Sequence, residues 1–272
     1  MRVSYQGEPG AFSEAAVLEY FGSEVLPQPQ KTFQEVFTAV ESGDCDAGMV
    51  PIENSLAGSI HENYDRLVKH TLWVVGEHFL RVRHCLIALP GVNLSEIRRV
   101  ISHPQALAQC DGYLAALKNV TSEPVYDTAG SVKIVKEQGD RSVAAIASQR
   151  AAVLYGMQIL KEGIEDNSAN HTRFLIISQQ PAPAGVNYKT SIVFSLRNQP
   201  GSLFKAMSVF ALRDIDLTKI ESRPLVGTPW DYLFYIDFAG CSADDNISRA
   251  LNHLNEYATM MRILGSYPRQ IP

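Results

Sequence analysis

A proline-rich segment, residues 179–185, most strongly constrains how this 272-residue chain can fold. It reads Gln-Gln-Pro-Ala-Pro-Ala-Gly and lacks the periodic apolar residues that would continue a helix or a strand. We therefore expect a large domain over 1–178, a linker over 179–187 and a small domain over 188–272. The apolar patterns on the two sides of the linker differ, which supports this division.

The first part alternates short apolar runs with helical patterns, which is typical of an α/β domain. Residues 32–35 form a capping box at the start of one helix, and Pro104 lies where a helix continuing to Leu117 begins. The predicted strands cover residues 2–6, 47–51, 72–76, 84–89, 99–102, 143–147 and 174–178.

The predicted strand-to-helix junctions are rich in Ser, Thr, Asn, Gly and Pro; they cover residues 7–13, 51–59, 102–105 and 127–131. Each can present free backbone N–H groups at a helix N-terminus, which favours anions. In open α/β sheets, ligands bind at the carboxyl ends of the strands, where such junctions meet. A single junction is more often just a capped helix. Together they favour a small anionic ligand.

The second part has the order strand, helix, strand, strand, helix, strand, which is the ferredoxin-like arrangement. Strands are predicted over 190–196, 217–222, 232–239 and 260–264, and helices over 203–211 and 247–258, with the middle strands joined through 224–229. Such a module has no chemistry of its own in most hosts, so a binding or assembly role is expected.

Composition and motifs exclude several classes of protein. The formal net charge of −5 and the lack of a basic cluster argue against nucleic-acid binding, and the apolar stretches are too short to span a membrane. The N-terminus has no apolar signal-peptide core and the cysteines are scattered, so we expect a reduced, cytoplasmic protein. Dinucleotide and P-loop motifs are absent and the histidines show no metal-ligand spacing, so no cofactor or metal is expected. His103 before Pro104 could be an acid or base, but a helix-cap role is commoner.

Two polar clusters are candidates for chemistry. In the first, Arg173 can bind a carboxylate through two N–H groups while the neighbouring Thr172 hydroxyl addresses an adjacent group. In the second, Glu53, Asn54 and Ser55 follow a buried-looking strand. From spacing alone, a surface arginine and a capped turn are the better interpretations.

Several segments, taken together and in this order, resemble the signature segments of prephenate dehydratases and plant-type arogenate dehydratases. They are Gly7-x-x-Gly10-x-x-Ser13-Glu14, Pro51-Ile52-Glu53-Asn54-Ser55, Ser102-His103-Pro104-Gln105-Ala106-Leu107, Asp127-Thr128-Ala129 and Asn170-x-Thr172-Arg173-Phe174. Two further segments resemble the ligand motifs of that family's C-terminal ACT domain: Asn198-x-Pro200-Gly201-Ser202-Leu203 and Glu221-Ser222-Arg223-Pro224. Some relatives read Gly-Ala-Leu-Val where this chain has Gly-Ser-Leu-Phe at 201–204, which leaves the strength of effector binding open.

The resemblance implies an α/β catalytic domain with the two-lobed fold of periplasmic binding proteins, followed by a ferredoxin-like ACT domain. It implies decarboxylation and dehydration of prephenate to phenylpyruvate, or of arogenate to phenylalanine, in a homodimer or homotetramer regulated by L-phenylalanine. The implied catalytic residues are Thr172, Arg173, Ser55 and Asn54, and the implied substrate-binding residues are Gly10, Ser13, Glu53, Gln105, Thr128 and Phe174. The implied effector residues are Asn198, Gly201, Ser202, Leu203, Glu221, Ser222 and Arg223.

Within this interpretation Thr172 donates a hydrogen bond to the departing hydroxyl, and Arg173 anchors a carboxylate or shapes the site. A non-enzymatic solute-binding or sensor protein would explain the anion-binding junctions equally well, but not the Thr-Arg-Phe segment beside a ferredoxin-like domain. A bifunctional chorismate mutase–dehydratase would need an extra helical domain, whereas we expect the chain to begin directly at the dehydratase strand. The choice between prephenate and arogenate stays open.

Overall fold

The computed structural model describes residues 1–225 and 232–271. Contacts group the chain into two compact units, of which the first comprises Met1–Asn63 and His78–Phe174 and the second comprises Tyr64–Glu77 and Leu175–Pro272. The units are therefore not continuous in sequence, and the boundary predicted at the linker remains a prediction.

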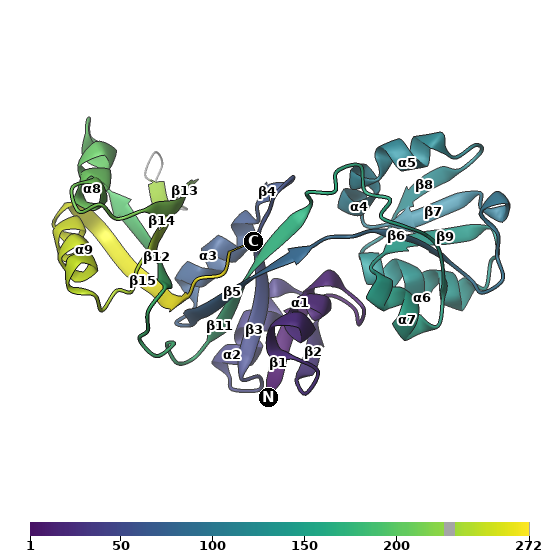
Figure 1. Ribbon diagram of the computed structural model, residues 1–272, viewed down its shortest axis with the longest axis horizontal. Helices are drawn as coiled ribbons and strands as arrows, with labels where there is room; N and C mark the ends of the chain where they lie inside the picture. Colours follow the sequence, from purple (N-terminus) through teal and green to yellow (C-terminus); the bar gives the residue numbers. More distant parts are fainter. Residues whose placement is uncertain (226–231, 272) are drawn as a thin grey trace. The chain divides into compact units, whose positions relative to one another are not determined.

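A six-stranded sheet contains the N-terminus, and its main strand order is β2-β1-β3-β11-β5 with β4 paired to β3 (Figure 1). Its strands are β1 (Arg2–Gln6), β2 (Leu26–Gln30), β3 (Ala47–Asn54), β4 (Gly58–Ser59), β5 (Trp73–Arg81) and β11 (His171–Ser178). Strands β2, β1 and β3 are parallel, and helices α1 (Phe12–Phe21) and α2 (Phe33–Glu41) pack against β1 and β3. Helix α3 (His61–Lys69) follows β4. The part of this sheet that belongs to the first unit, together with the rest of Met1–Asn63, is called the first lobe below.

A five-stranded sheet of order β10-β6-β9-β7-β8 forms the second lobe. Its strands are β6 (Cys85–Ala88), β7 (Arg99–Ser102), β8 (Thr121–Pro124), β9 (Val143–Ala147) and β10 (Gln158–Glu162). Its helices are α4 (Pro104–Gln109), α5 (Asp111–Ala116), α6 (Thr128–Gln138) and α7 (Gln149–Tyr155). Figure 1 shows α4 and α5 on one face of this sheet and α6 and α7 on the other. The chain enters this lobe between β5 and β6 and leaves it between β10 and β11, which gives the two-lobed arrangement that was predicted.

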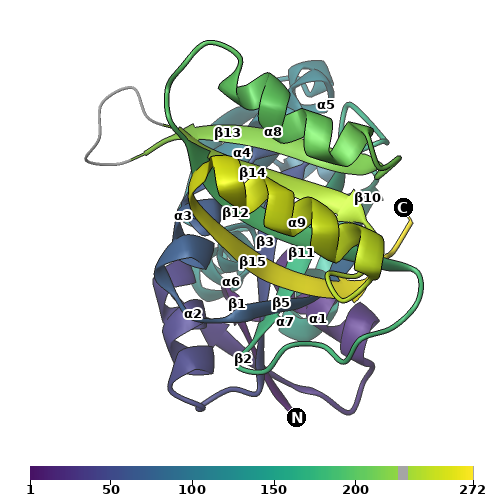
Figure 2. The same ribbon diagram turned by 90° about the vertical axis from the view of Figure 1, so that its left-hand side faces the viewer.

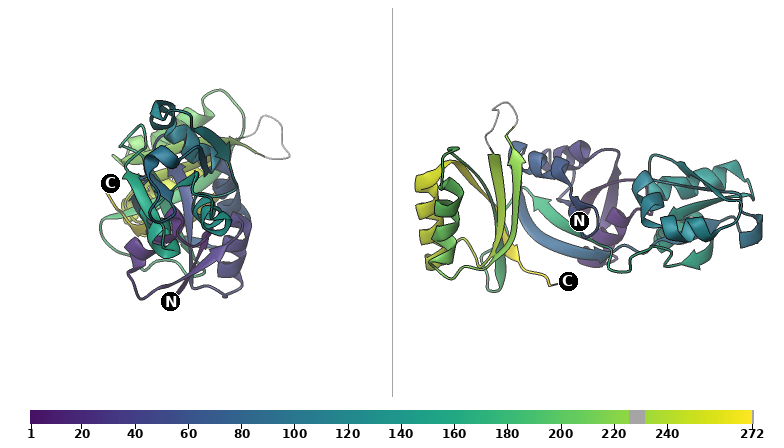
Figure 3. Two further views of the ribbon diagram at one scale, coloured as in Figure 1. Left: turned by 90° about the vertical axis from the view of Figure 1, so that its right-hand side faces the viewer. Right: turned by 90° about the horizontal axis from the view of Figure 1, so that it is seen from above.

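The C-terminal part confirms the predicted order of strands and helices. It contains β12 (Tyr188–Leu196), α8 (Ser202–Ala211), β13 (Leu217–Pro224), β14 (Tyr232–Ala239), α9 (Asp245–Tyr257) and β15 (Ala258–Pro268). The sheet order is β13-β14-β12-β15, and every pair of neighbours is antiparallel. Figures 2 and 3 show α8 and α9 side by side on one face, over a core that includes Phe194, Phe210 and Phe238. The connection predicted over 224–229 lies, from residue 226 on, outside the described residues.

The structure corrects the prediction of one helix continuing from Pro104 to Leu117. Pro104 does begin α4, but the helix stops at Gln109 and a separate helix, α5, begins at Asp111. Cys110 between them has φ −120° and ψ 18°, which is not helical, and its side chain is fully buried. Burial of this side chain at the helix break fits tertiary packing overriding the local pattern.

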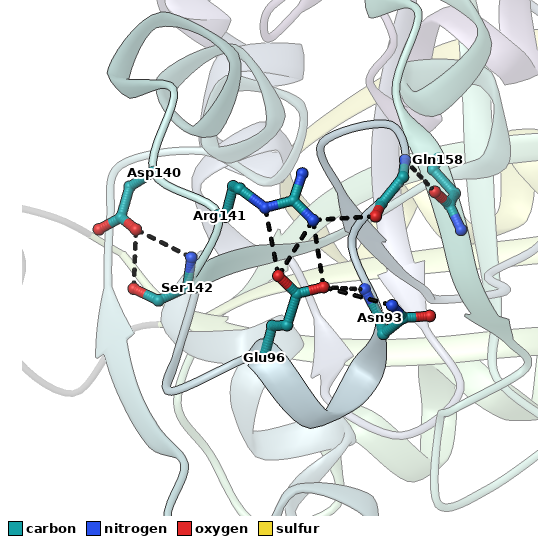
Figure 4. A network of polar contacts seen from close by, with 7 residues as sticks. Asn93, Glu96, Asp140, Arg141, Ser142 and Gln158 are labelled. Atoms are coloured by element: carbon teal, nitrogen blue, oxygen red, sulfur yellow. Dashed lines mark hydrogen bonds and ion pairs between the residues drawn. The ribbon is translucent and has the colours of Figure 1, made fainter.

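A surface loop of the second lobe is fixed by a polar network around Glu96 (Figure 4). The short 3-10 helix η1 (Leu94–Glu96) begins with a capping box, in which the Glu96 carboxylate accepts a hydrogen bond from the Asn93 N–H at 2.7 Å. Arg141 donates to the same carboxylate at 3.0 Å and to the Gly91 carbonyl at 2.9 Å. The Asn93 N–H and then the Arg141 side chain hold the pKa of Glu96 below its usual value.

Candidate active site

A pocket of about 520 Å³ lies within the first unit and is lined by residues of both lobes. This volume is within the range of small-molecule sites. The first lobe contributes Gln6, Ala11, Phe12, Ser13, Lys31, Thr32, Phe33, Pro51, Asn54, Ile60, Glu62, Thr172 and Phe174. The entry to the second lobe contributes Val82 and His84, and the second lobe contributes His103, Gln105, Ala106, Gln109, Tyr126, Asp127 and Thr128.

N-terminal residues of helices α1, α2, α4 and α6 line this pocket, and the junction argument predicted this for α1, α4 and α6. Side chains cap α2, α4 and α6: Thr32 accepts from the Glu35 N–H, His103 Nδ1 from the Gln105 N–H, and Asp127 from the Gly130 N–H. These termini direct partial positive charge toward the pocket, which suits an anionic substrate.

The side chains of Asn54 and Thr172 meet at the wall of the pocket. Asn54 is the last residue of β3, and Thr172 is the second residue of β11. The Asn54 Nδ2 group donates to Thr172 Oγ1 at 3.1 Å. The opposite end of the same amide accepts two backbone N–H groups, from Leu56 at 3.1 Å and from Ala57 at 2.9 Å.

Those two backbone bonds fix which end of the Asn54 amide is oxygen and which is nitrogen. Because backbone N–H groups can only donate, the atom that they contact must be Oδ1, and the atom facing Thr172 must be Nδ2. Thr172 Oγ1 is therefore an acceptor toward Asn54. Its own proton remains available for a different partner, and Thr172 lines the pocket.

Arg173 lies between the pocket residues Thr172 and Phe174 in strand β11. Successive side chains of a strand point to opposite faces, so Arg173 belongs to the other face of the sheet. It is buried and is not among the described residues that line the pocket.

Some of the other predicted site residues line the pocket and others do not. Ser13, Gln105 and Thr128 line the pocket together with Asn54, Thr172 and Phe174, whereas Glu53, Ser55 and Gly10 are not among the described lining residues. The Ser55 hydroxyl donates to the Ala169 carbonyl at 2.8 Å and accepts from the His171 N–H at 2.9 Å, which joins the ends of β3 and β11.

Gly10 lies against the second lobe. Its N–H donates to Glu14, its carbonyl accepts from the Ser148 hydroxyl at 2.6 Å, and a Cβ at this position would lie 2.8 Å from the Ala151 Cα. With φ at +95° and this close approach, the position requires glycine. The structure thus gives Gly10 a contact between the lobes.

Three pocket residues outside the predicted set, His84, Gln109 and Asp127, were not recognised as site residues from the sequence. Burial raises the pKa of the Asp127 carboxyl, although N–H groups at the start of α6 partly oppose this. Burial lowers the pKa of His84, opposed in part by its hydrogen bond to Gln109. Asp127 begins a segment that carried the family resemblance and could have been found that way, whereas His84 and Gln109 carried no sequence signal.

The predicted effector residues lie in the second unit, on two elements of the C-terminal sheet and helix layer. Asn198, Gly201, Ser202 and Leu203 occupy the turn and the first residues of α8, where Gly201 has φ +82°. Glu221, Ser222 and Arg223 lie on β13, an edge strand of its sheet. Arg223 donates to Asp65 at 2.7 Å.

Residues 3–182 match the family model for prephenate dehydratase. The chain belongs to the prephenate dehydratase family. Among its relatives, arogenate dehydratase/prephenate dehydratase 2 of Arabidopsis thaliana is 50% identical over 98% of this chain and 73% of that protein. Arogenate dehydratase 2 of Petunia hybrida is 48% identical over 98% of this chain and 72% of that protein.

Solved structures agree with this family and fold. The prephenate dehydratase of Arthrobacter aurescens in complex with L-Phe has a TM-score of 0.91 and 32% identity, covering 99% of this chain and 90% of that one. GqqA, described as a novel type of quorum quenching acylases, has a TM-score of 0.92 and 37% identity, covering 99% and 98% of the two chains. The α/β fold predicted from the sequence is confirmed, and family membership makes this chain an enzyme that removes water.

The prediction of a cytoplasmic protein is wrong. Three relatives from Arabidopsis thaliana, which are 46–50% identical to this chain, are named chloroplastic. The prediction rested on the lack of an apolar signal core, and plastid-targeting segments are amphipathic and rich in Ser and Arg, so that test does not detect them.

Two further findings concern metals and membranes. Among the described residues, no group of three or more His, Cys, Asp or Glu side chains could hold a metal ion. None of the helices within residues 1–225 and 232–271 is long and apolar enough to cross a membrane.

Proposed function

We propose that this chain is a decarboxylating dehydratase, a carbon–oxygen lyase that acts on prephenate or arogenate in phenylalanine biosynthesis. The observation that carries the proposal is the Thr172 hydroxyl, which accepts from Asn54 and keeps its proton for a ligand in the pocket. The family, and relatives named for both substrates, support the same reaction.

The reaction needs no covalent intermediate. The bond between the ring and its carboxylate breaks to release CO₂, its electron pair enters the ring, and the C4–O bond breaks as the hydroxyl leaves with a proton as water. Thr172 donates a hydrogen bond to this oxygen as negative charge develops on it. Assistance of this kind contributes about 10²- to 10⁴-fold to the rate.

Asp127 is the pocket residue best suited to hold the proton that water formation consumes. Burial raises the pKa of its carboxyl, so the group stays protonated to a higher pH than a solvated aspartate. Thr172 by itself is a poor acid, and it therefore acts as a donor of a hydrogen bond and not as the source of the proton.

Substrate carboxylates are bound by helix N-termini and by Lys31 and His103, which line the pocket. Arg173 is assigned to positioning, because its side chain belongs to the other face of β11. An arginine paired with the leaving carboxylate would stabilise the ground state and slow decarboxylation, so a site without that pairing suits the chemistry.

The C-terminal β-α-β-β-α-β part is proposed to be an ACT domain that binds L-phenylalanine and regulates the enzyme. The effector site would include Gly201 at the start of α8 and Glu221–Arg223 on β13. A similar solved enzyme is described in complex with L-Phe, which supports this ligand. Because β13 lies at the edge of its sheet, a strand from a second copy of the chain could extend the sheet there, which favours a homodimer or homotetramer.

The experiment is to incubate the purified full chain separately with prephenate and arogenate, following phenylpyruvate by absorbance and phenylalanine by chromatography. We expect turnover of at least one substrate, and strong loss of that turnover in Thr172→Ala. Binding of both compounds without turnover of either would replace the proposal with a solute-binding role.

A further inference from the structure

A chain of hydrogen-bonded side chains runs from Thr172 into the segments that connect the two lobes. The two hydrogens of Asn54 Nδ2 face three acceptors, which are Asn170 Oδ1 at 2.7 Å, Thr172 Oγ1 at 3.1 Å and the His171 carbonyl at 3.2 Å. Asn170 Nδ2 donates to Gln109 Oε1 at 3.0 Å, and His84 Nε2 lies 2.9 Å from the same Gln109 oxygen. His84 and Asn170 lie on the segments by which the chain enters and leaves the second lobe, so the hydrogen bonds join both segments to the pocket.

The direction of each bond follows from the previous one, starting at Asn54. Its Nδ2 end is fixed by the two backbone N–H groups that occupy its oxygen. Asn170 must then present its oxygen to Asn54 and its nitrogen to Gln109, and Gln109 must present its oxygen to Asn170.

Gln109 Oε1 also faces His84, so His84 Nε2 must carry a hydrogen and donate it. Because burial lowers the pKa of this ring, the neutral form with hydrogen on Nε2 is favoured. Its Nδ1 is then a bare acceptor, and that atom is buried without a hydrogen-bond partner.

Gln109 Oε1 is the point at which two buried donors meet. Asn170 is fully buried and is not a lining residue, and His84 is 2% exposed. If Oε1 were removed, both donors would lose their acceptor. A buried donor without an acceptor is costly, so we expect the Asn170 amide to rotate and break the 2.7 Å hydrogen bond to Asn54.

We propose that Gln109 is a positioning residue for Thr172. Through Asn170 and Asn54 it keeps the Thr172 hydroxyl in the orientation that donates into the pocket. This inference rests on the proposed dehydratase function and adds a residue, from the second lobe, on which the donor depends. The orientation of the donor thereby depends on a residue of the other lobe, because Gln109 is at the end of α4 whereas Thr172 is on β11.

The first test uses the unaltered protein and no substrate. With ¹⁵N in its seven histidines, the His84 ring is assigned by comparison with His84→Gln, and its nitrogen shifts report which nitrogen carries hydrogen. We expect hydrogen on Nε2 and none on Nδ1. Hydrogen on Nδ1 alone would reverse the direction of the bonds and overturn the proposal, whatever the fate of the proposed function.

The second test compares two substitutions of similar length. Gln109→Met removes the acceptor, whereas Gln109→Glu keeps an oxygen that accepts from both donors. We expect Gln109→Met to lower kcat by about 10- to 100-fold with a small change in KM, since misplacement of a reacting group by about 1 Å can cost that much. Gln109→Glu should recover most of the loss. The control is Gln138→Met, at the exposed end of α6, which should leave kcat unchanged.

The third test distinguishes positioning from structural support. In a Thr172→Ala background the donor is already absent, so Gln109→Met should lower kcat no further. A loss of kcat that adds in full to that of Thr172→Ala, or equal losses in Gln109→Met and Gln109→Glu, would overturn the proposal.

If Gln109→Met does not fold, Gln109→Asn, one carbon shorter, replaces it in the same comparisons. An inactive wild type or an active Thr172→Ala would instead contradict the proposed function. The direction of the hydrogen bonds would then be tested by the ¹⁵N measurement on His84 alone.

Discussion

The hydroxyl of Thr172 is the group on which the proposed chemistry most depends. Thr172→Ala removes the donor without adding charge, so we expect kcat to fall by about 10²-fold or more, with a smaller effect on KM. Thr172→Ser keeps the hydroxyl and should retain part of the activity. Steady-state kinetics with each substrate measure this, with Thr121→Ala on the exposed strand β8 as the control. Near-normal kcat in Thr172→Ala would exclude Thr172 as the donor.

Asn54 offers a sharper test of the same idea, because aspartate has nearly the same shape. In Asn54→Asp one oxygen still accepts from the Leu56 and Ala57 N–H groups, so the turn after β3 should be kept. The other oxygen would face Thr172 and accept the proton that the wild type directs into the pocket, and the Asn170 amide would have to turn its NH₂ group toward this oxygen. We expect kcat to fall by about 10-fold or more while the far-ultraviolet circular dichroism stays unchanged. Unchanged kcat would show that the direction of this hydrogen bond does not matter.

His84 should make stability depend on pH. Burial lowers the pKa of its ring in the folded protein, whereas the ring titrates near about 6.5 in the unfolded chain. The contribution of the neutral His84 ring to the free energy of unfolding is therefore complete above about pH 6.5. It is lost as the pH falls through the lower folded pKa, because the unfolded chain binds a proton at a higher pH than the folded chain does. The urea midpoint should fall between about pH 7.5 and about pH 5.5. The fall should be smaller in His84→Gln, which keeps a donor for Gln109; equal falls would contradict the assignment.

At the level of elements, Arg262 of β15 stabilises the C-terminal end of α3. Its guanidinium donates to the carbonyl groups of Leu67, Val68, His70 and Leu72. The last carbonyls of a helix have no partner within the helix, so an arginine here supplies what α3 lacks. Arg262→Met keeps an apolar stem and removes the donors, and we expect it to lower the free energy of unfolding by about 2–3 kcal/mol.

Urea unfolding of the full chain measures this effect. Arg249→Met is the matched control, since Arg249 is exposed on α9 and donates to the Asp245 carbonyl within its own helix. It should change stability by less than about 0.5 kcal/mol. Equal losses in the two variants would mean that the four carbonyl contacts contribute little.

The elements also show what the sequence could and could not predict. The capping box at Thr32 and the start of α4 at Pro104 were predictable, because both depend on residues within one turn. Strands β2 and β8 were missed. Each contains proline and lies at the edge of its sheet, where a missing N–H is tolerated but the apolar alternation of a strand is weak.

The site was predictable to the extent that its residues lie in short segments. Asn54 and Thr172 were found through such segments, yet the contact between them joins residues 118 positions apart. Gln109 enters the site through a hydrogen bond to Asn170, 61 positions away, and His84 through one to Gln109, 25 positions away, and nothing in their neighbouring residues marks them. The face to which Arg173 belongs follows from strand alternation, but only once the strand is known to begin at His171 rather than at Phe174.

For the whole molecule, the second unit is built from more than the C-terminal part. It includes residues 64–77, whose Glu77 is fully buried and pairs with Lys189 at 2.8 Å. A chain cut near Gln180 would remove Lys189 together with most of the second unit, so residues 64–77 would lose this ion pair and the part of the chain with which they are grouped. Loss of regulation in such a fragment would therefore carry little information, and the effector site is better tested in the full chain.

The sharpest place for that test is Gly201. Its φ of +82° is left-handed, and a Cβ there would have no atom within 4 Å, so the position has room for a side chain but disfavours most residues. Asparagine tolerates this conformation better than residues other than glycine, so Gly201→Asn should fold while placing an amide over the N–H groups that begin α8.

L-Phenylalanine at 100 times its Kd should stabilise the wild type by about 2.7 kcal/mol, seen as a rise in Tm, and should inhibit turnover. We expect Gly201→Asn to lose both responses. Gly139→Asn, at a left-handed glycine after α6 with equally open space, should keep both. A Tm shift and inhibition that persist in Gly201→Asn would place the phenylalanine site elsewhere in the chain.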